Sequence, residues 1–92
     1  MSVKKDISID HLFEAVLTLK NIDECYKFFG DACTEKEIQA IAQRFEVAKM
    51  LAEKKVYNEI VEKTGASTAT ISRVNRSIND GYAMVFERLK TK

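Results

Sequence analysis

The sequence predicts an all-α protein of about six helices, and three observations lead to that prediction. The 92 residues include no proline and only three glycines, so the chain has few of the residues that form the tight turns of a β-sheet. Apolar residues recur every three or four positions along most of the chain, which is the period of an α-helix. The composition, 46% hydrophobic and 32% charged, is typical of one small folded domain and not of a disordered chain.

Charge and hydropathy exclude several classes of protein. Lys and Arg number 15 against 14 Asp and Glu, so the chain is not a polycation, although a locally basic face stays open. No apolar run approaches the roughly 20 residues of a membrane helix, and none resembles a signal peptide. We therefore expect a cytoplasmic protein without a membrane contact, in which Cys25 and Cys33 are reduced, buried thiols.

Two helices are predicted in the first third of the chain. Residues 1–6 look frayed, and apolar residues at helical spacing predict a helix from Asp10 onward. A second helix is predicted over residues 21–29, because Asn21 can cap its first turn and Gly30 is a typical stop signal.

A third, longer helix is predicted to begin after Thr34. The segment Thr34-Glu-Lys-Glu37 is a capping box, in which a hydroxyl and a carboxylate each satisfy a free amide of the first turn. The helix is expected to run to about Lys55. Its predicted apolar stripe consists of Ile38, Ile41, Ala42, Phe45, Ala48, Leu51 and Ala52. A helix of this length in so small a chain has little of its own chain to cover it, which favours a dimer.

The last third of the sequence has the pattern of a helix-turn-helix followed by one more helix. Residues 57–64 predict a short helix, and Gly65 is suited to a turn that needs positive φ. A second helix is predicted from Ser67 to about Asn79, with Ile71 and Val74 facing inward against Ile60 and Val61 of the first. The sequence Asn-Asp-Gly at 79–81 predicts a stop before a final helix over residues 82–89.

The outer face of the second of these helices has the side chains that a major groove about 12 Å wide admits, because they are short, polar or basic. They are Ser67, Thr68, Ala69, Thr70, Ser72, Arg73 and Arg76. Many two-helix corners with a glycine turn bind nothing, and residues 56–80 hold three basic and three acidic residues. A single copy should therefore bind double-stranded DNA weakly, and two copies helped by Lys49, Lys54 or Lys55 should bind it better.

A family resemblance covers roughly half of the chain, from about Cys33 to Asn79. Its most telling segments are Thr34-Glu-Lys-Glu, Ala40-Ile-Ala-Gln-Arg44 and Gly65-Ala-Ser-Thr-Ala-Thr-Ile-Ser-Arg73. In these segments the chain resembles the Trp repressor superfamily, most closely its small TrpR-related (YerC/YecD-like) branch. The resemblance implies one helix-turn-helix domain over residues 1–92, an intertwined homodimer of six-helix chains, and repression of transcription by operator binding.

Carried over position by position, the resemblance places the groove-contacting face on Asn58, Val61, Thr68, Ala69 and Ser72. Asn58 and Val61 stand where the Trp repressor has basic residues, so we expect a different operator.

The positions that bind the corepressor tryptophan in that family fall on Thr34, Arg44 and Arg73. An arginine can stack on an indole and another can pair with a carboxylate. Val74, however, stands where the Trp repressor has glycine, and a valine would intrude on the indole by an overlap that costs on the order of 1–3 kcal/mol. We hypothesise that Val74 replaces the indole as a wedge under the second helix, so that the protein binds DNA without tryptophan or with another small effector.

Several residues also have simpler structural interpretations, which compete with the DNA-binding and effector-binding roles. Arg44 is as well suited to an ion pair with Glu37 or Glu46, and Thr34 is first of all a helix cap. His11 has no second ligand at a suitable spacing, so no metal site is expected. No nucleophile and base are paired in the sequence, so we expect no enzyme. The main rival to a DNA-binding regulator is a helical protein–protein adaptor that has lost DNA binding.

Overall fold

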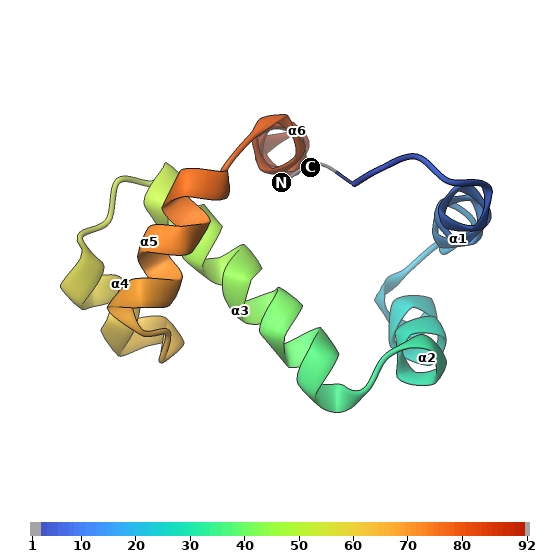
Figure 1. The fold of residues 1–92 in the computed structure, drawn as a ribbon, viewed down its shortest axis with the longest axis horizontal. Coiled ribbons are helices and arrows are strands. Elements are labelled where there is room, and N and C mark those ends of the chain that lie inside the picture. Colours follow the sequence, from blue (N-terminus) through green and yellow to red (C-terminus); the bar gives the residue numbers. More distant parts are fainter. Residues whose placement is uncertain (1–2, 92) are drawn as a thin grey trace. The chain divides into compact units, whose positions relative to one another are not determined.

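The predicted all-helical fold is confirmed. The computed structural model describes residues 3–91, and these form six helices and no strand (Figure 1). The helices are α1 (Ile7–Val16), α2 (Ile22–Ala32), α3 (Glu35–Ala52), α4 (Tyr57–Thr64), α5 (Thr68–Ser77) and α6 (Asp80–Lys90). None of these helices is long and apolar enough to cross a membrane. The chain divides into two compact units, one ending at Ile38 and the other beginning at Gln39.

In the first unit, α1 begins earlier than expected because of a side-chain cap. Asp6 accepts hydrogen bonds from the Ser8 amide (2.7 Å) and hydroxyl, and these bonds lower the pKa of the Asp6 carboxyl. The cap starts the helix at Ile7, so the predicted start at Asp10 is wrong. Of the segment expected to fray, residues 1 and 2 lie outside the described residues.

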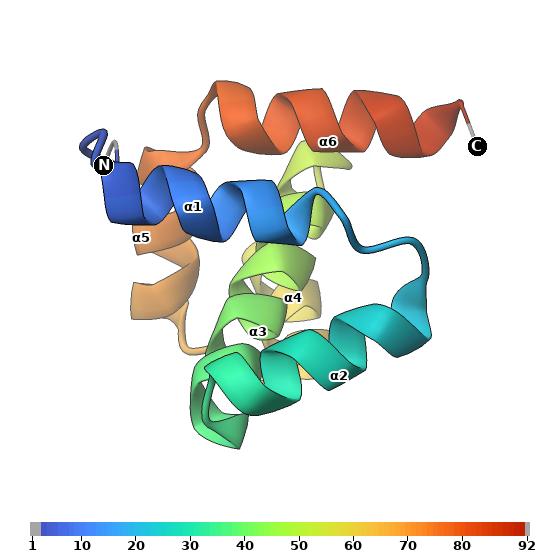
Figure 2. The same cartoon turned by 90° about the vertical axis from the view of Figure 1, so that its right-hand side faces the viewer.

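The helix α2 begins where the sequence predicted but ends later. Asn21 accepts a hydrogen bond from the Glu24 amide (2.9 Å), which confirms the cap. The Glu24 carboxylate in turn accepts from the Lys20 amide (2.9 Å). The helix passes through Gly30 and ends at Ala32, so the predicted stop at Gly30 is wrong. In Figure 2, α1 and α2 run in opposite directions.

No residue of α1 or α2 is buried. Leu17 is 83% exposed, and Ile22 and Tyr26 are 73% and 78% exposed. Cys25 is exposed and Cys33 half-buried, and both thiols are free. The expectation of two buried thiols is therefore wrong for the single chain.

The predicted capping box at the start of α3 is confirmed. The Glu37 carboxylate accepts from the Thr34 amide (2.7 Å), and the Thr34 hydroxyl accepts from the Glu37 amide (3.2 Å). These bonds, the backbone one first, lower the pKa of the Glu37 carboxyl.

The helix α3 ends at Ala52 and not at Lys55, because the chain turns through a left-handed residue. Lys54 has φ 63°, and its amide donates to the Leu51 carbonyl (3.0 Å). The Lys55 amide donates to the Met50 carbonyl (3.0 Å). This pair of bonds is the Schellman arrangement that closes the carboxyl end of many helices.

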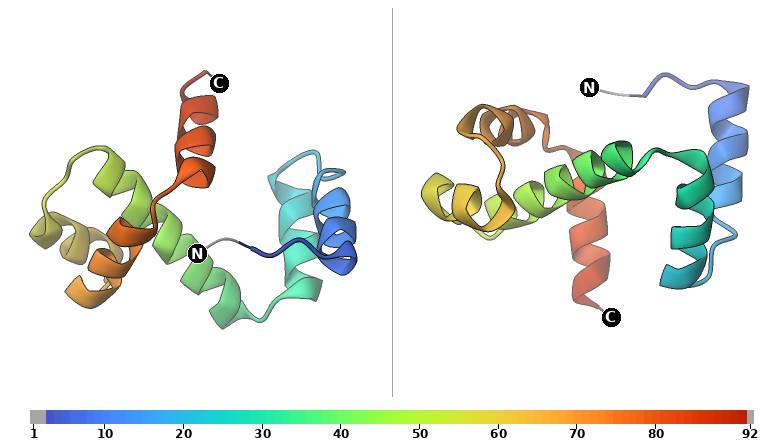
Figure 3. Two further views of the ribbon diagram at one scale, coloured as in Figure 1. Left: turned by 45° about the horizontal axis from the view of Figure 1, so that its top comes forward. Right: turned by 90° about the horizontal axis from the view of Figure 1, so that it is seen from below.

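The buried core of the described residues lies wholly in the second unit, where α4 and α5 pack against the carboxyl-terminal half of α3 (Figures 1 and 3). It consists of Val47, Ala48, Met50, Ile60, Ala66, Ile71 and Val74. The predicted stripe on α3 was partly wrong, because Ile41 is 47% exposed and Ala42 and Ala52 are also exposed. Val47 and Met50, which the stripe omitted, are buried instead.

The helix α6 begins at Asp80, two residues before the predicted start, and joins α3 through three aromatic rings. The Phe45 ring centroid lies 5.4 Å from that of Phe86 and 6.4 Å from that of Tyr82. Tyr82 and Phe86 stack on each other at 5.8 Å. No residue of α6 is fully buried, and Met84 and Leu89 are 46% and 44% exposed.

Candidate nucleic-acid interface

The turn between α4 and α5 is fixed by one glycine and one threonine. Gly65 has φ 73°, and its amide donates to the Val61 carbonyl (2.9 Å), so it closes α4 in the left-handed conformation that glycine adopts without strain. The Thr64 hydroxyl donates to the Ile60 carbonyl (2.7 Å) and accepts from the Ala66 amide (3.1 Å). These bonds set the direction in which the chain enters α5.

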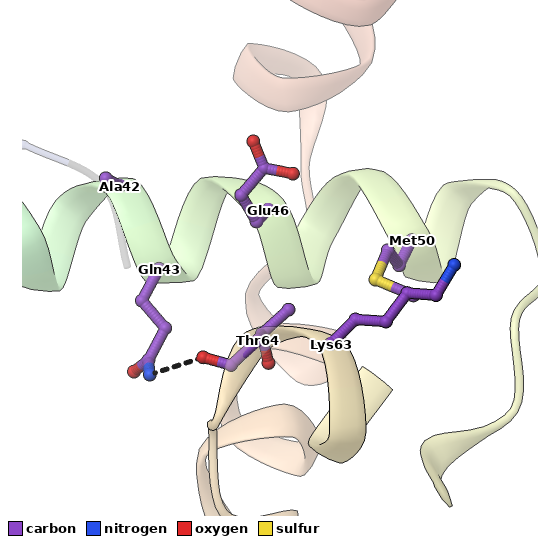
Figure 4. Close-up of a pocket in the computed structure, with 6 residues that line it drawn as sticks. All are labelled: Ala42, Gln43, Glu46, Met50, Lys63 and Thr64. Carbon is purple, nitrogen blue, oxygen red and sulfur yellow. Dashed lines mark hydrogen bonds between the residues drawn. The ribbon is translucent and has the colours of Figure 1, made fainter. Parts of the chain in front are cut away.

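A side chain of α3 supports the same turn. Gln43 Nε2 donates to the Thr64 carbonyl (3.2 Å), as Figure 4 shows. Nothing in the sequence pointed to Gln43, because a contact between residues 21 positions apart leaves no local pattern. It ties the carboxyl end of α4 to the long helix.

The inner face of α5 is apolar, as the sequence predicted. Ile71 is fully buried and Val74 is 2% exposed. Ile60 of α4 is also fully buried, and Val61 is half-buried against the same core. The two helices therefore hold each other through large side chains, and the outer face of α5 follows from helical geometry.

The residues predicted to contact DNA lie on α4 and α5 or at the cap of α5, and one of them, Val61, is half-buried against the core. Ser67 caps α5, since its hydroxyl accepts from the Thr70 amide (3.1 Å). Thr70 and Ser72 are half-buried. The remaining predicted residues are exposed: Asn58, Ser67, Thr68, Ala69, Arg73 and Arg76. We call the eight residues other than Val61 the reading face.

The charges around the reading face are few. Glu59 and Lys63 form an ion pair on α4 (3.7 Å). Arg73 and Arg76 have no ion-pair partner among residues 3–91. Two free guanidinium groups beside short hydroxyl side chains can bind phosphate oxygens and base edges.

The residues predicted to bind an effector are divided between the two units of the chain. Thr34 belongs to the first unit, whereas Arg44 and Arg73 are exposed in the second. The ion pair expected between Arg44 and Glu37 or Glu46 is not present in the described part of the chain. Val74 fills space between the helices with its own side chain.

A shallow hollow of about 370 Å³ lies between α3 and α4, on the side of α4 where Lys63 projects (Figure 4). It is lined by Ala42, Gln43, Glu46, Met50, Lys63 and Thr64, none of which was predicted as a site residue. Over residues 3–91, no three His, Cys, Asp or Glu side chains are grouped so that they could hold a metal ion.

Comparisons with known proteins agree with this architecture. The family model described as Trp repressor protein matches residues 7–90. The uncharacterized protein YerC of Bacillus subtilis is 54% identical over 85 residues, which are 89% of this chain and 82% of YerC.

Two solved structures have nearly the same fold. A TrpR-like protein from Eubacterium eligens superposes with a TM-score of 0.90 at 61% identity, covering 94% of this chain and 92% of its own. A protein from Staphylococcus aureus superposes with a TM-score of 0.89 at 48% identity, covering 96% of this chain and 91% of its own.

Proposed function

This chain belongs to the Trp repressor protein family, and from that premise we propose that it is a homodimeric, sequence-specific DNA-binding regulator that represses transcription. The family and fold are those of transcription regulators and not of enzymes. In this proposal α5 enters the major groove and the bound dimer excludes RNA polymerase from the operator. We also propose that the protein works in the cytoplasm.

The observation that carries the proposal is the division of α5 into two faces. Ile71 and Val74 are buried, whereas Thr68, Ala69 and Arg73 are exposed on the opposite side. Small hydroxyl residues are mediocre helix formers, and a face that is merely solvated more often has Glu and Lys. The composition of this face is what base reading needs, because short side chains let the helix backbone approach the bases.

The homodimer is supported by apolar surface that one chain leaves uncovered. No residue of α1, α2 or α6 is buried, and large apolar side chains such as Ile7 (71% exposed) and Leu17 (83% exposed) face outward. Exposed apolar surface of this extent is uncommon on a protein that works as a single chain. Two copies would also bring two reading faces to one two-fold site.

We further propose that the dimer binds DNA without tryptophan. Val74 is 2% exposed and packs in the same core as Ile60 and Ile71, so it already holds α5 from beneath. Val74→Gly should lower the free energy of unfolding by about 2–4 kcal/mol. The variant loses the buried side chain, and glycine loses more backbone entropy than valine when it folds into a helix. The same substitution should weaken DNA binding, because α5 loses its support. Added tryptophan should restore the DNA binding of this variant and leave that of the wild type unchanged.

Titrations with tryptophan would check both parts of that claim. The chain itself contains no tryptophan, so the indole fluorescence of the ligand can be followed directly. If the wild type binds tryptophan at low micromolar concentration, Val74 does not act as a wedge.

The adaptor remains the second candidate, because the helix-turn-helix is electrically neutral and Lys63 is paired with Glu59. The two candidates differ in a binding titration with mixed genomic fragments at several salt concentrations. A DNA-binding regulator forms complexes that weaken steeply as the salt rises, since each phosphate contact releases counterions. An adaptor forms no such complex.

A further inference from the structure

Lys54 holds a backbone conformation that is unfavourable for its residue type. Apart from Gly65, it is the sole residue of the described chain with positive φ (63°). Its amide and that of Lys55 make the two hydrogen bonds that close α3. Glycine is the usual residue at this position, because a Cβ atom there meets the following carbonyl. The fold alone would therefore favour glycine over Lys54.

The charge of Lys54 is not needed to stabilise the end of α3. A cation in or near the last turn interacts favourably with the helix dipole. Lys49 lies in the last turn of α3, and Lys55 follows the helix directly, so both can make this interaction from unstrained conformations. Neither the backbone conformation nor the helix dipole therefore explains why position 54 is a lysine.

The proposed DNA contact supplies such a reason, because the helix-turn-helix has no net charge of its own. Within residues 56–80, Arg73 and Arg76 are balanced by Glu62 and Asp80, and Lys63 is paired with Glu59. Binding to any duplex depends mainly on phosphate contacts made by basic side chains. Basic groups next to the reading face must therefore provide part of the attraction.

Of the three nearby lysines, two are well placed for this role. Lys49 lies on α3 one helical turn from both Glu46 and Glu53, which offset its charge. Lys54 and Lys55 are both exposed in the short connection that leads into α4. They precede Asn58 of the reading face by four and three residues respectively, so the connection leads directly into the first turn of α4, which holds Asn58.

We propose that Lys54 and Lys55 bind the DNA phosphate backbone at the edge of the reading face, and that Lys54 keeps its strained conformation because its charge is needed at that point. The inference rests on the proposed function and adds to it a pair of contacts that carry no base specificity. It also predicts that fold stability and DNA affinity conflict at one residue.

The test is a pair of measurements on Lys54→Gly. Relief of the strained conformation should raise the melting temperature by roughly 4 °C. Loss of the phosphate contact should weaken binding to a labelled random-sequence duplex by about tenfold near 0.1 M salt and lower the salt slope by about one unit per bound chain. Lys54→Asn should weaken binding equally, because asparagine also tolerates positive φ but has no charge. Lys54→Arg keeps the charge and should therefore retain the binding.

Lys63→Gln is the matched control, because it removes the same charge from α4 on the side that faces the hollow. It should leave the salt slope unchanged. If Lys54→Gly binds the duplex as the wild type does, or if Lys63→Gln loses as much affinity, the proposed contact is wrong while the DNA-binding function stands. If the wild type forms no salt-sensitive complex with any duplex, the proposed function fails and the contact with it.

Discussion

The helix-turn-helix and the helices around it differ in how much of their apolar surface a single chain buries. The core of the described residues is made by α3, α4, α5 and the turn at Ala66. In contrast, α1, α2 and α6 bury no residue, although they have apolar side chains at helical spacing. The difference teaches that the two regions are stabilised in different ways. The helix-turn-helix is held by a core within one chain, and the rest depends, in our proposal, on a second copy.

The largest expected effect separates these two kinds of stability. Ile71→Ala should lower the free energy of unfolding by about 2–5 kcal/mol at every protein concentration, because Ile71 is fully buried within one chain. Ile22→Ala, at a position 73% exposed in the single chain, should destabilise through the dimer. Its effect should therefore be small at low protein concentration, where the chains are single, and should grow as the concentration rises and the dimer contributes to stability. Thermal unfolding at several concentrations measures both; a loss for Ile22→Ala that does not vary with concentration would contradict the comparison.

The second prediction concerns the outer face of the stable region. Arg76→Ala should weaken binding to all duplexes by about tenfold and lower the salt slope by about one unit per bound chain, as expected for a phosphate contact. Thr68→Ala and Ser72→Ala should change base preference at particular positions and leave the slope as it is. Binding curves on mixed and selected duplexes check this. An unchanged affinity for Arg76→Ala would mean that α5 docks differently.

A smaller effect contrasts the glycines of the two regions. Gly65→Ala should lower the free energy of unfolding by about 1 kcal/mol, because φ there is 73° even though a Cβ would meet no other atom. Gly30→Ala, in the interior of α2 and equally open, should raise it by about 0.5–1 kcal/mol. Chemical denaturation of both variants measures the two changes in the free energy of unfolding. Changes of the same sign would refute the backbone conformations assigned to Gly65 and Gly30.

The smallest expected effect is a pH dependence at the start of α3. The lowered pKa of Glu37 means that its capping bonds stabilise the fold above the ordinary pKa of the carboxyl. That contribution is lost as the pH falls through the lowered folded-state pKa. Glu37→Gln should therefore flatten part of the loss of stability in acid, as measured by melting temperature against pH. An acid limb identical to that of the wild type would show that the capping box contributes nothing there.

Local signals predicted the helix-turn-helix well. The end of α4 follows from Gly65, and the start of α5 follows from the Ser67 cap, since each depends on one residue and its neighbours. The inward positions of Ile60, Ile71 and Val74 follow from helical period alone. These are the parts of the fold for which residue type and spacing suffice.

The errors have physical causes that a local pattern does not contain. The end of α3 moved because Lys54 adopts positive φ, which its residue type disfavours. The buried side of α3 depends on where α4 and α5 pack, and so Val47 and Met50 replaced Ile41 and Ala52 in the core. Gly30 did not stop α2, since the backbone bonds continue to Cys33, whose amide donates to Phe29.

The most direct test of the central claim is a selection of genomic DNA fragments by the purified protein, with and without added tryptophan. We predict enrichment of one two-fold-symmetric sequence in the absence of tryptophan, because two reading faces would read two half-sites and Val74 would hold each α5 in place. Enrichment that requires tryptophan would contradict the role of Val74. The absence of any enriched sequence under both conditions would contradict the assignment of the helix-turn-helix to DNA reading.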